Sequence, residues 1–311
     1  MVRAEDGRSV AAERISNCLR YRWPRLDLSN LQLETVPEPL GDLTHLIKLD
    51  LSGNGLTALP QWLGGLTHLT ELDLNCNGLT VLPEWLGDLT NLTTLQLGGI
   101  ELTVLPEWLS NLTALTWLDL GCNELTTLPE WLGGLTNLTY LELRCNELTA
   151  LPETLGDLTN LIYLDLSDLR LATLPEWLGN LTRLNELYLS SNGLTVLPEW
   201  LGDLTALAWL NLSYNQLTAL PESLRNLTVL RELLLDSNRL TALPEWMGGL
   251  THLNALYLSN NELTAIPEWL GHLTTLTVLD LSGNQLVSPE SVENLAALHE
   301  FHRDGYRLTR A

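Results

Sequence analysis

Lysine is almost absent from this chain of 311 residues: Lys48 is the single lysine, and 16 Lys and Arg face 38 Asp and Glu, for a net charge of −22. Because proteins hold phosphate backbones through Lys and Arg, this charge argues against nucleic acid and anionic membrane surfaces as partners. Between Lys48 and Arg144 there are eleven acidic residues and no basic one. This stretch favours a basic partner; an acidic surface that only maintains solubility is the alternative.

Long apolar runs are also missing. No stretch of about 18 uninterrupted apolar residues predicts a transmembrane helix, and residues 1–30 lack the apolar segment of a signal peptide. The four cysteines are too few for a dense disulfide framework. We therefore expect a cytoplasmic protein, with secretion as an effector without a classical signal peptide as the alternative.

The common catalytic motifs are absent too, including the phosphate-binding, dinucleotide-binding, zinc-protease and serine-hydrolase patterns. None of the six histidines lies near a Cys or Ser in a way that suggests an activated nucleophile. We expect no catalytic residue, no cofactor and no metal. Cys122 and Cys145 are 23 residues apart; they are either a disulfide pair or small residues tolerated before a turn.

What the chain does contain is a 23-residue repeat rich in leucine. Eleven units begin at Leu43 and recur to Leu273, with the pattern L-T-x-L-x-x-L-x-L-x-x-N-x-L-T-x-L-P-E-W-L-G-x. Leucines at alternate positions, such as Leu49 and Leu51, predict a short strand with one buried face. The asparagine predicts a turn, and the proline predicts a short helical or 3₁₀ segment on the opposite side.

This pattern resembles the leucine-rich repeat family in its 23-residue form, over about residues 20–308. The resemblance implies an α/β solenoid, shaped as a horseshoe, with a parallel sheet on the concave face and helical or 3₁₀ segments on the convex face. It also implies protein binding, and bacterial proteins carry similar arrays. We expect a capping helix within residues 1–24, a solenoid over 25–294 and a C-terminal cap over 295–311, in a single domain.

Two details depart from the repeat. Residues 8–20 have apolar side chains at helical spacing (Val10, Ile15, Leu19), and residues 289–304 resemble a C-terminal counterpart of this helix. The turn asparagine is replaced at Leu31, Ile100 and Leu169, so these turns are expected to lack its amide.

Ten of the eleven tryptophans fall into two groups. Eight of them share the P-E-W position and predict a half-buried convex ladder, with a convex contact surface as the alternative. Trp117 and Trp209 instead belong to the strands, where the leucine lattice requires no aromatic residue. We expect the concave face between residues 112 and 216 to bind a partner, with aromatic packing alone as the alternative. The predicted partner-binding residues are Trp117, Asp119, Tyr140, Glu142, Arg144, Tyr163, Asp165, Tyr188, Trp209 and Tyr214.

Three of these carboxylates, Asp119, Glu142 and Asp165, could also mimic an acid–base pair or a cation site, although a column at one strand position explains them more simply. The sequence thus predicts a protein–protein interaction module that recognises a basic protein partner. We expect a monomer. Self-association through the convex tryptophans or the caps is the alternative.

Overall fold

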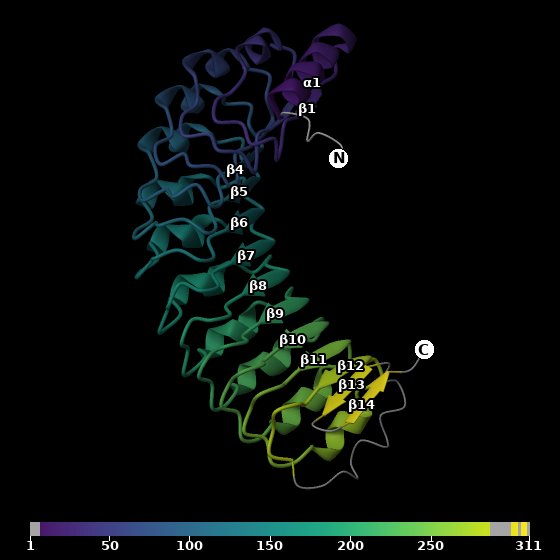
Figure 1. The fold of residues 1–311 in the computed structure, drawn as a ribbon. Coiled ribbons are helices and arrows are strands. Elements are labelled where there is room, and N and C mark those ends of the chain that lie inside the picture. Colours follow the sequence, from purple (N-terminus) through teal and green to yellow (C-terminus); the bar gives the residue numbers. More distant parts are fainter. Residues whose placement is uncertain (1–6, 287–299, 304–305, 310–311) are drawn as a thin grey trace. The chain divides into compact units, whose positions relative to one another are not determined.

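The computed structural model describes residues 7–286, 300–303 and 306–309 of the chain. The chain divides into two compact units, residues 1–160 and 161–311. Each unit is built from repeated coils, in which a three-residue strand alternates with a five-residue 3₁₀ turn. In each unit the strands line one side and the 3₁₀ turns line the other (Figure 1). The leucine-rich-repeat architecture predicted from the sequence is confirmed in both units.

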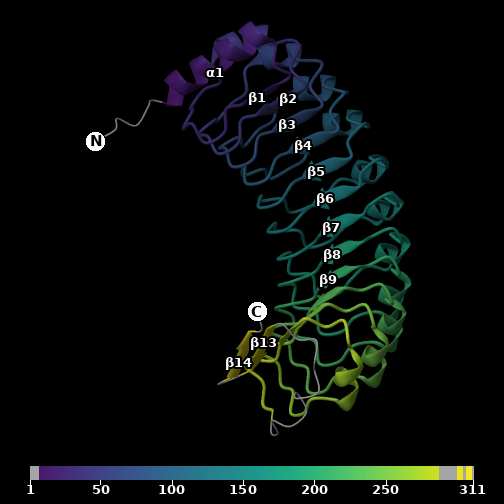
Figure 2. The same cartoon turned by 90° about the vertical axis from the view of Figure 1, so that its right-hand side faces the viewer.

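The first unit begins with the helix α1 (Gly7–Tyr21), which packs beside β1 at the end of its sheet (Figure 2). The helix buries Ala11, Ile15 and Cys18, whereas Leu19 is 38% exposed. The buried face of this helix therefore differs in part from the prediction. Ile15 is buried as expected, but Cys18 is buried in place of Leu19. Burial raises the pKa of the Cys18 thiol.

Six strands of the first unit pair in parallel and in register. They are β1 (Arg25–Asp27), β2 (Lys48–Asp50), β3 (Glu71–Asp73), β4 (Thr94–Gln96), β5 (Trp117–Asp119) and β6 (Tyr140–Glu142). The 3₁₀ turns behind them are Glu38–Asp42, Gln61–Gly65, Glu84–Asp88, Glu107–Asn111, Glu130–Gly134 and Glu153–Asp157.

The second unit repeats this plan. Its strands are β7 (Tyr163–Asp165), β8 (Glu186–Tyr188), β9 (Trp209–Asn211), β10 (Glu232–Leu234), β11 (Ala255–Tyr257) and β12 (Val278–Asp280), all parallel. Its 3₁₀ turns are Glu176–Asn180, Glu199–Asp203, Glu222–Asn226, Glu245–Gly249 and Glu268–His272.

The second unit ends in a strand pair. β13 (Glu300–Arg303) pairs in parallel with β12, and β14 (Tyr306–Thr309) returns antiparallel to it. Residues 300–303, expected as part of a helical cap, are therefore a strand; residues 289–299 lie outside the described part of the chain. The domain boundaries drawn from the sequence stay a prediction.

Leucine forms the core because each strand points its middle residue inward. Leu118 and Leu141, for example, are fully buried between outward-facing neighbours. Buried asparagines then satisfy the backbone at the turns: the side-chain amide of Asn77 donates to the carbonyls of Leu51 and Leu74, and its oxygen accepts the N–H of Leu56. Each coil is thereby joined to the one before it.

In the coils without this asparagine, the residue in its place donates its own backbone N–H to the asparagine of the next coil, as Asn192 also does to Asn215. Asn123 accepts two backbone N–H groups, from Ile100 at 3.1 Å and Leu102 at 3.0 Å. Asn54 and Asn192 do the same for the coils of Leu31 and Leu169. Leu31, Ile100 and Leu169 thus supply no amide themselves, but their own backbone N–H groups are satisfied.

Candidate functional site

The candidate site lies on the strand face, which we define as the outward-pointing side chains of the strands. Each strand contributes its first and third residues to this face, because its second residue points to the core. Neighbouring strands are in register, so first residues form one column and third residues another. The predicted site residues lie in these columns or in the turn beyond them, and each unit is described separately.

In the first unit, Trp117 and Tyr140 are brought together at the first position of β5 and β6. Their rings stack with centroids 3.4 Å apart and planes 6° apart. Trp117 remains 38% exposed although it is a large apolar side chain. On its other side the register partner is Thr94, a short side chain. The stack therefore presents an accessible indole on a rigid strand.

The carboxylate of Glu142 is hydrogen-bonded to one member of this stack. It is 5% exposed, it accepts a hydrogen bond from the hydroxyl of Tyr140 at 3.3 Å, and its Oε1 lies 3.6 Å from Nε of Arg144. The backbone N–H of Arg144 also donates to it. Glu142 and Arg144 are thus neighbours as predicted, but Glu142 positions Tyr140 and offers little surface to a partner.

Asp119 is held in a polar network that the sequence did not reveal. Its oxygens accept from the N–H of Gly121 at 2.9 Å and from Asn75 at 3.1 Å. Asn75 lies two coils away, and its oxygen accepts the N–H of Gly98. The signal that could have found this link is the pair of small residues Gly98 and Gly121, because they leave room above Asp119 for a side chain from further along the sheet.

Asp73 belongs to the same network. It accepts from the N–H of Asn75 and from Gln96. Burial, together with the nearby charges of Asp50 and Asp119, raises the pKa of Asp73 to about 6 against the opposing effect of the Asn75 hydrogen bond. The raised pKa means that the surroundings of Asp73 disfavour its negative charge.

In the second unit, Tyr163 contacts Tyr188 with ring centroids 5.2 Å apart. The hydroxyl of Tyr188 donates to Glu186 at 3.1 Å, and burial and the charges of Glu186, Asp165 and Glu232 raise the pKa of that hydroxyl. Asp165 is 5% exposed and accepts the N–H of Ser167. Tyr163 and Tyr188 are half-buried, whereas Trp117 is exposed.

Trp209 and Tyr214 lie further along the second unit. Trp209 is half-buried at the first position of β9, in register with Glu186 and Glu232. Tyr214 is 65% exposed and has a φ of +56°, a left-handed conformation that costs a non-glycine residue about 1 kcal/mol. The lattice gains nothing from this ring, so Tyr214 stays a candidate contact residue.

Cysteines 76, 122 and 145 occupy this same left-handed turn position, with φ values of +55°, +52° and +52°. In the neighbouring coils the position is held by Gly53 and Gly99. The N–H of Cys122 donates to the carbonyl of Arg144 at 2.7 Å, which fixes adjacent coils together at this turn. What these residues share is the left-handed backbone conformation, and a small side chain is sufficient at this position.

The tryptophans of the 3₁₀ turns pack on glycine. A Cβ placed on Gly87 would lie 3.0 Å from Cβ of Trp108, and one on Gly248 would lie 3.1 Å from Cβ of Trp269. Trp85, Trp177 and Trp269 are below 10% exposed. Where the preceding coil carries glycine, the ring thus covers it, and this explains the recurring Gly and Trp positions better than stacking between tryptophans.

Within the described residues, no group of three or more His, Cys, Asp or Glu is arranged to hold a metal ion. Among those residues, no helix has the length and apolar character needed to cross a membrane.

Comparisons with known proteins agree with this architecture. The family model described as leucine-rich repeat region matches residues 5–128 and 130–212, and two further leucine-rich-repeat models match 228–286 and 206–227. No curated protein sequence matches the chain.

Solved structures give the same result. A leucine-rich-repeat protein of Leptospira interrogans is 38% identical with a TM-score of 0.86, over 94% of this chain and 74% of that one. An internalin of Listeria monocytogenes is 26% identical with a TM-score of 0.76, over 97% and 94%. The ectodomain of the Arabidopsis receptor kinase HAESA, solved with a peptide hormone ligand, is 31% identical with a TM-score of 0.66, over 92% and 55%. On its repeat, its fold and these matches, the chain belongs to the leucine-rich repeat family.

Proposed function

We propose that the protein is a protein-interaction module, and that the strand face of its first unit recognises a basic segment of a protein partner. The observation that carries this proposal is the stack of Trp117 on Tyr140, in which Trp117 is 38% exposed and shares a strand with the hydrogen-bonded carboxylate of Asp119. Leucine-rich-repeat proteins commonly bind other proteins, and the HAESA ectodomain was solved with a peptide on it.

The chemistry of this surface fits an arginine side chain. Asp119 lies two residues from Trp117 on the same face of β5, roughly 7 Å along the strand. A guanidinium can therefore lie flat on the indole and turn its N–H groups toward the carboxylate. Lys48 is already ion-paired with Glu71, so it does not neutralise Asp119.

Binding should be tested with a labelled peptide of alternating arginine and glycine, by fluorescence anisotropy. Trp117→Thr copies Thr94 of the neighbouring strand, so the fold should tolerate it. We expect it to weaken binding about tenfold, equivalent to about 1.4 kcal/mol, whereas Trp117→Phe should retain most of the affinity. Val104→Ala, which changes a side chain that is 69% exposed and lies outside the strands, is the matched control.

The pH and salt dependence give independent readouts. A bound cation stabilises the ionised form of Asp73, so affinity should rise as the pH increases from 5 to 7 through the raised pKa of about 6. Affinity should also fall with added salt. Equal binding by Trp117→Thr and the unchanged protein would refute the proposal, and so would an equal affinity for a glutamate–glycine peptide.

The cytoplasmic location and the monomeric state stay predictions. Self-association is tested by light scattering at low and high salt, where a constant monomer mass would exclude it. A binding role is proposed in preference to catalysis because the carboxylates nearest the stack, Asp119 and Glu142, are tied to neighbouring amides, N–H groups and Arg144.

A further inference from the structure

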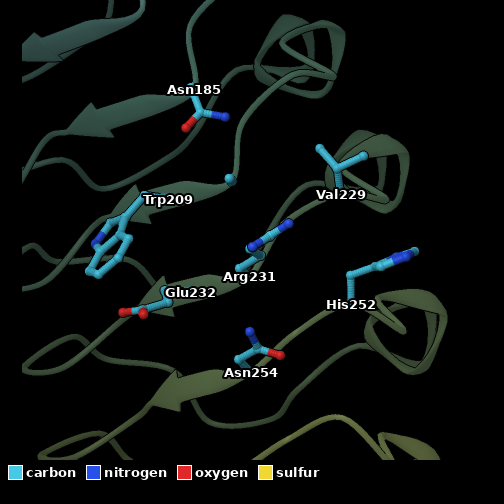
Figure 3. A pocket seen from close by; sticks show the side chains of 8 residues that line it. Asn185, Trp209, Val229, Arg231, Glu232, His252 and Asn254 are labelled. Carbon is cyan, nitrogen blue, oxygen red and sulfur yellow. The ribbon is translucent and has the colours of Figure 1, made fainter.

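A second surface lies at one edge of the second unit, apart from the stack of Trp117 and Tyr140. It is a cavity of about 690 Å³, within the size range of small-molecule sites. Figure 3 shows its lining: Asn185, Ala208, Trp209, Val229, Arg231, Glu232, His252 and Asn254.

The cavity is built on one column of the repeat, which we call the rim column: the residue just before the first residue of each strand. Backbone hydrogen bonds join successive members, from the N–H of Ala208 to Asn185 at 2.8 Å, of Arg231 to Ala208 at 2.8 Å and of Asn254 to Arg231 at 2.7 Å. These four residues are therefore side by side on consecutive coils.

In the first unit the same column carries threonine on four consecutive coils. Its members Thr70, Thr93, Thr116 and Thr139 each donate the side-chain hydroxyl to the carbonyl of the residue one coil earlier. Threonine is thus what the scaffold uses, and the column resumes it at Thr277. The column also departs from threonine at Ile47 and Ile162, but the four consecutive departures at 185, 208, 231 and 254 are the ones that line the cavity.

The charged groups of the cavity are not neutralised by each other. In the part of the chain that the structure describes, neither the guanidinium of Arg231 nor the carboxylate of Glu232 has a hydrogen-bond or ion-pair partner. Although they are neighbours in sequence, the two side chains lie apart in Figure 3: Glu232 is near Trp209, and Arg231 is on the side of Val229 and His252.

Apolar and hydrogen-bonding groups complete the lining. Trp209 offers its half-buried ring, and Ala208 and Val229 offer aliphatic surface. His252 is anchored through Nδ1, which lies 2.9 Å from the carbonyl oxygen of Thr228, so that Nε2 remains for a ligand. Burial raises the pKa of the Glu232 carboxyl, which shows that this carboxyl has lost part of its contact with water.

We propose that this cavity binds a small zwitterion, namely an α-amino acid with an aromatic side chain or a dipeptide of the same kind. Its carboxylate would pair with Arg231, its ammonium group with Glu232, and its side chain would pack on Trp209. A guanidinium and a carboxylate that face one cavity without pairing are complementary to a ligand that carries both charges. Asn185 and Asn254 can hydrogen-bond either end.

The test is calorimetric titration with L-phenylalanine at millimolar concentration, compared with 3-phenylpropanoate, which lacks the ammonium group, and 2-phenylethylamine, which lacks the carboxylate. Each analogue should bind at least tenfold more weakly than the amino acid. The dipeptide glycyl-phenylalanine has its ammonium and carboxylate groups further apart than phenylalanine does. Whichever of the two binds more tightly shows whether the cavity takes an amino acid or a dipeptide.

Substitutions that introduce the threonine of the rim column should leave the folding stability unchanged. Arg231→Thr and Ala208→Thr introduce the residue that the rim column carries in other coils, and both should reduce affinity at least tenfold. Glu232→Gln should abolish the preference for phenylalanine over 3-phenylpropanoate. Arg239→Thr, which removes an exposed arginine that does not line the cavity, is the control and should leave affinity unchanged.

Three outcomes would overturn the proposal: no heat of binding for either zwitterion, equal affinity for 3-phenylpropanoate, or unchanged affinity in Arg231→Thr. The peptide test on Trp117 uses a different unit and a different probe, so failure of one proposal leaves the result of the other readable.

Discussion

The asparagines at the turns should not be equivalent, although they occupy the same lattice position. Asn123 and Asn146 are each 6% exposed, and both donate to two backbone carbonyls at 3.0 Å or less. They differ in what they accept. Asn123 accepts the N–H groups of Ile100 and Leu102, whereas Asn146 accepts that of Leu125.

Replacing each asparagine with alanine measures this difference. Asn146→Ala leaves one N–H and the carbonyls without their side-chain partner, which should reduce the free energy of unfolding by about 3 kcal/mol. Asn123→Ala leaves a second buried N–H, at Ile100, and should cost about 1–3 kcal/mol more. Because both variants remove the same atoms at the same exposure, the packing loss cancels in the comparison.

The assay combines urea unfolding with hydrogen exchange. A repeat array can unfold in parts, so the midpoints are compared only where the slopes agree. Exchange of the Ile100 amide gives the local readout: it should lose protection in Asn123→Ala and retain it in Asn146→Ala. Equal midpoints together with an unchanged Ile100 amide would refute the idea that one asparagine serves two N–H groups.

Three further predictions follow from the first unit. Because the pKa of Asp73 is raised to about 6 in the folded state, its ionisation opposes folding above that pH. Asp73→Asn should therefore stabilise the protein by about 1 kcal/mol at pH 7, a value reduced for solvent screening. In urea titrations this gain should vanish near pH 4. Cys122→Gly should raise the free energy of unfolding by up to about 1 kcal/mol, because glycine accepts the φ of +52° without steric cost, and a lower midpoint would contradict this. Gly87→Ala should cost about 1–3 kcal/mol, since its Cβ would press on Trp108, while Gly65→Ala, with nothing within 4 Å of the new Cβ, should be nearly neutral in the same melting experiment.

The fold was predictable because it repeats. The 23-residue spacing gives the strand, the turn and the 3₁₀ segment of every coil, and the leucines give the buried face. The asparagine position was also predictable as a source of turn hydrogen bonds. How Asn123 serves two N–H groups was not, because this depends on the backbone of the coil around Ile100 and not on any residue type.

The candidate site was predictable only in outline. Trp117 and Tyr140 stand out because the lattice does not need them, and their stack follows from strand register. The burial of Glu142, the reach of Asn75 to Asp119 and the α1 face completed by Cys18 depend on side-chain directions, which the spacing does not determine. The break in the rim column can be read from the sequence, but the cavity that accompanies it requires the coordinates.

The packing of tryptophan on glycine also constrains how such a gene can gain or lose repeats. At two places a small residue replaces the tryptophan, and there the coils approach so closely that a Cβ on Gly133 or Gly202 would collide with the carbonyl oxygen of Thr154 or Ser223. Deleting one 23-residue block between coils that pair glycine with tryptophan gives the glycine another tryptophan. A deletion that removes the coil of Thr154 places the Trp177 coil against a neighbour spaced for a smaller side chain. Loss of whole repeats should therefore be tolerated unevenly along the chain, with these two junctions as the least exchangeable.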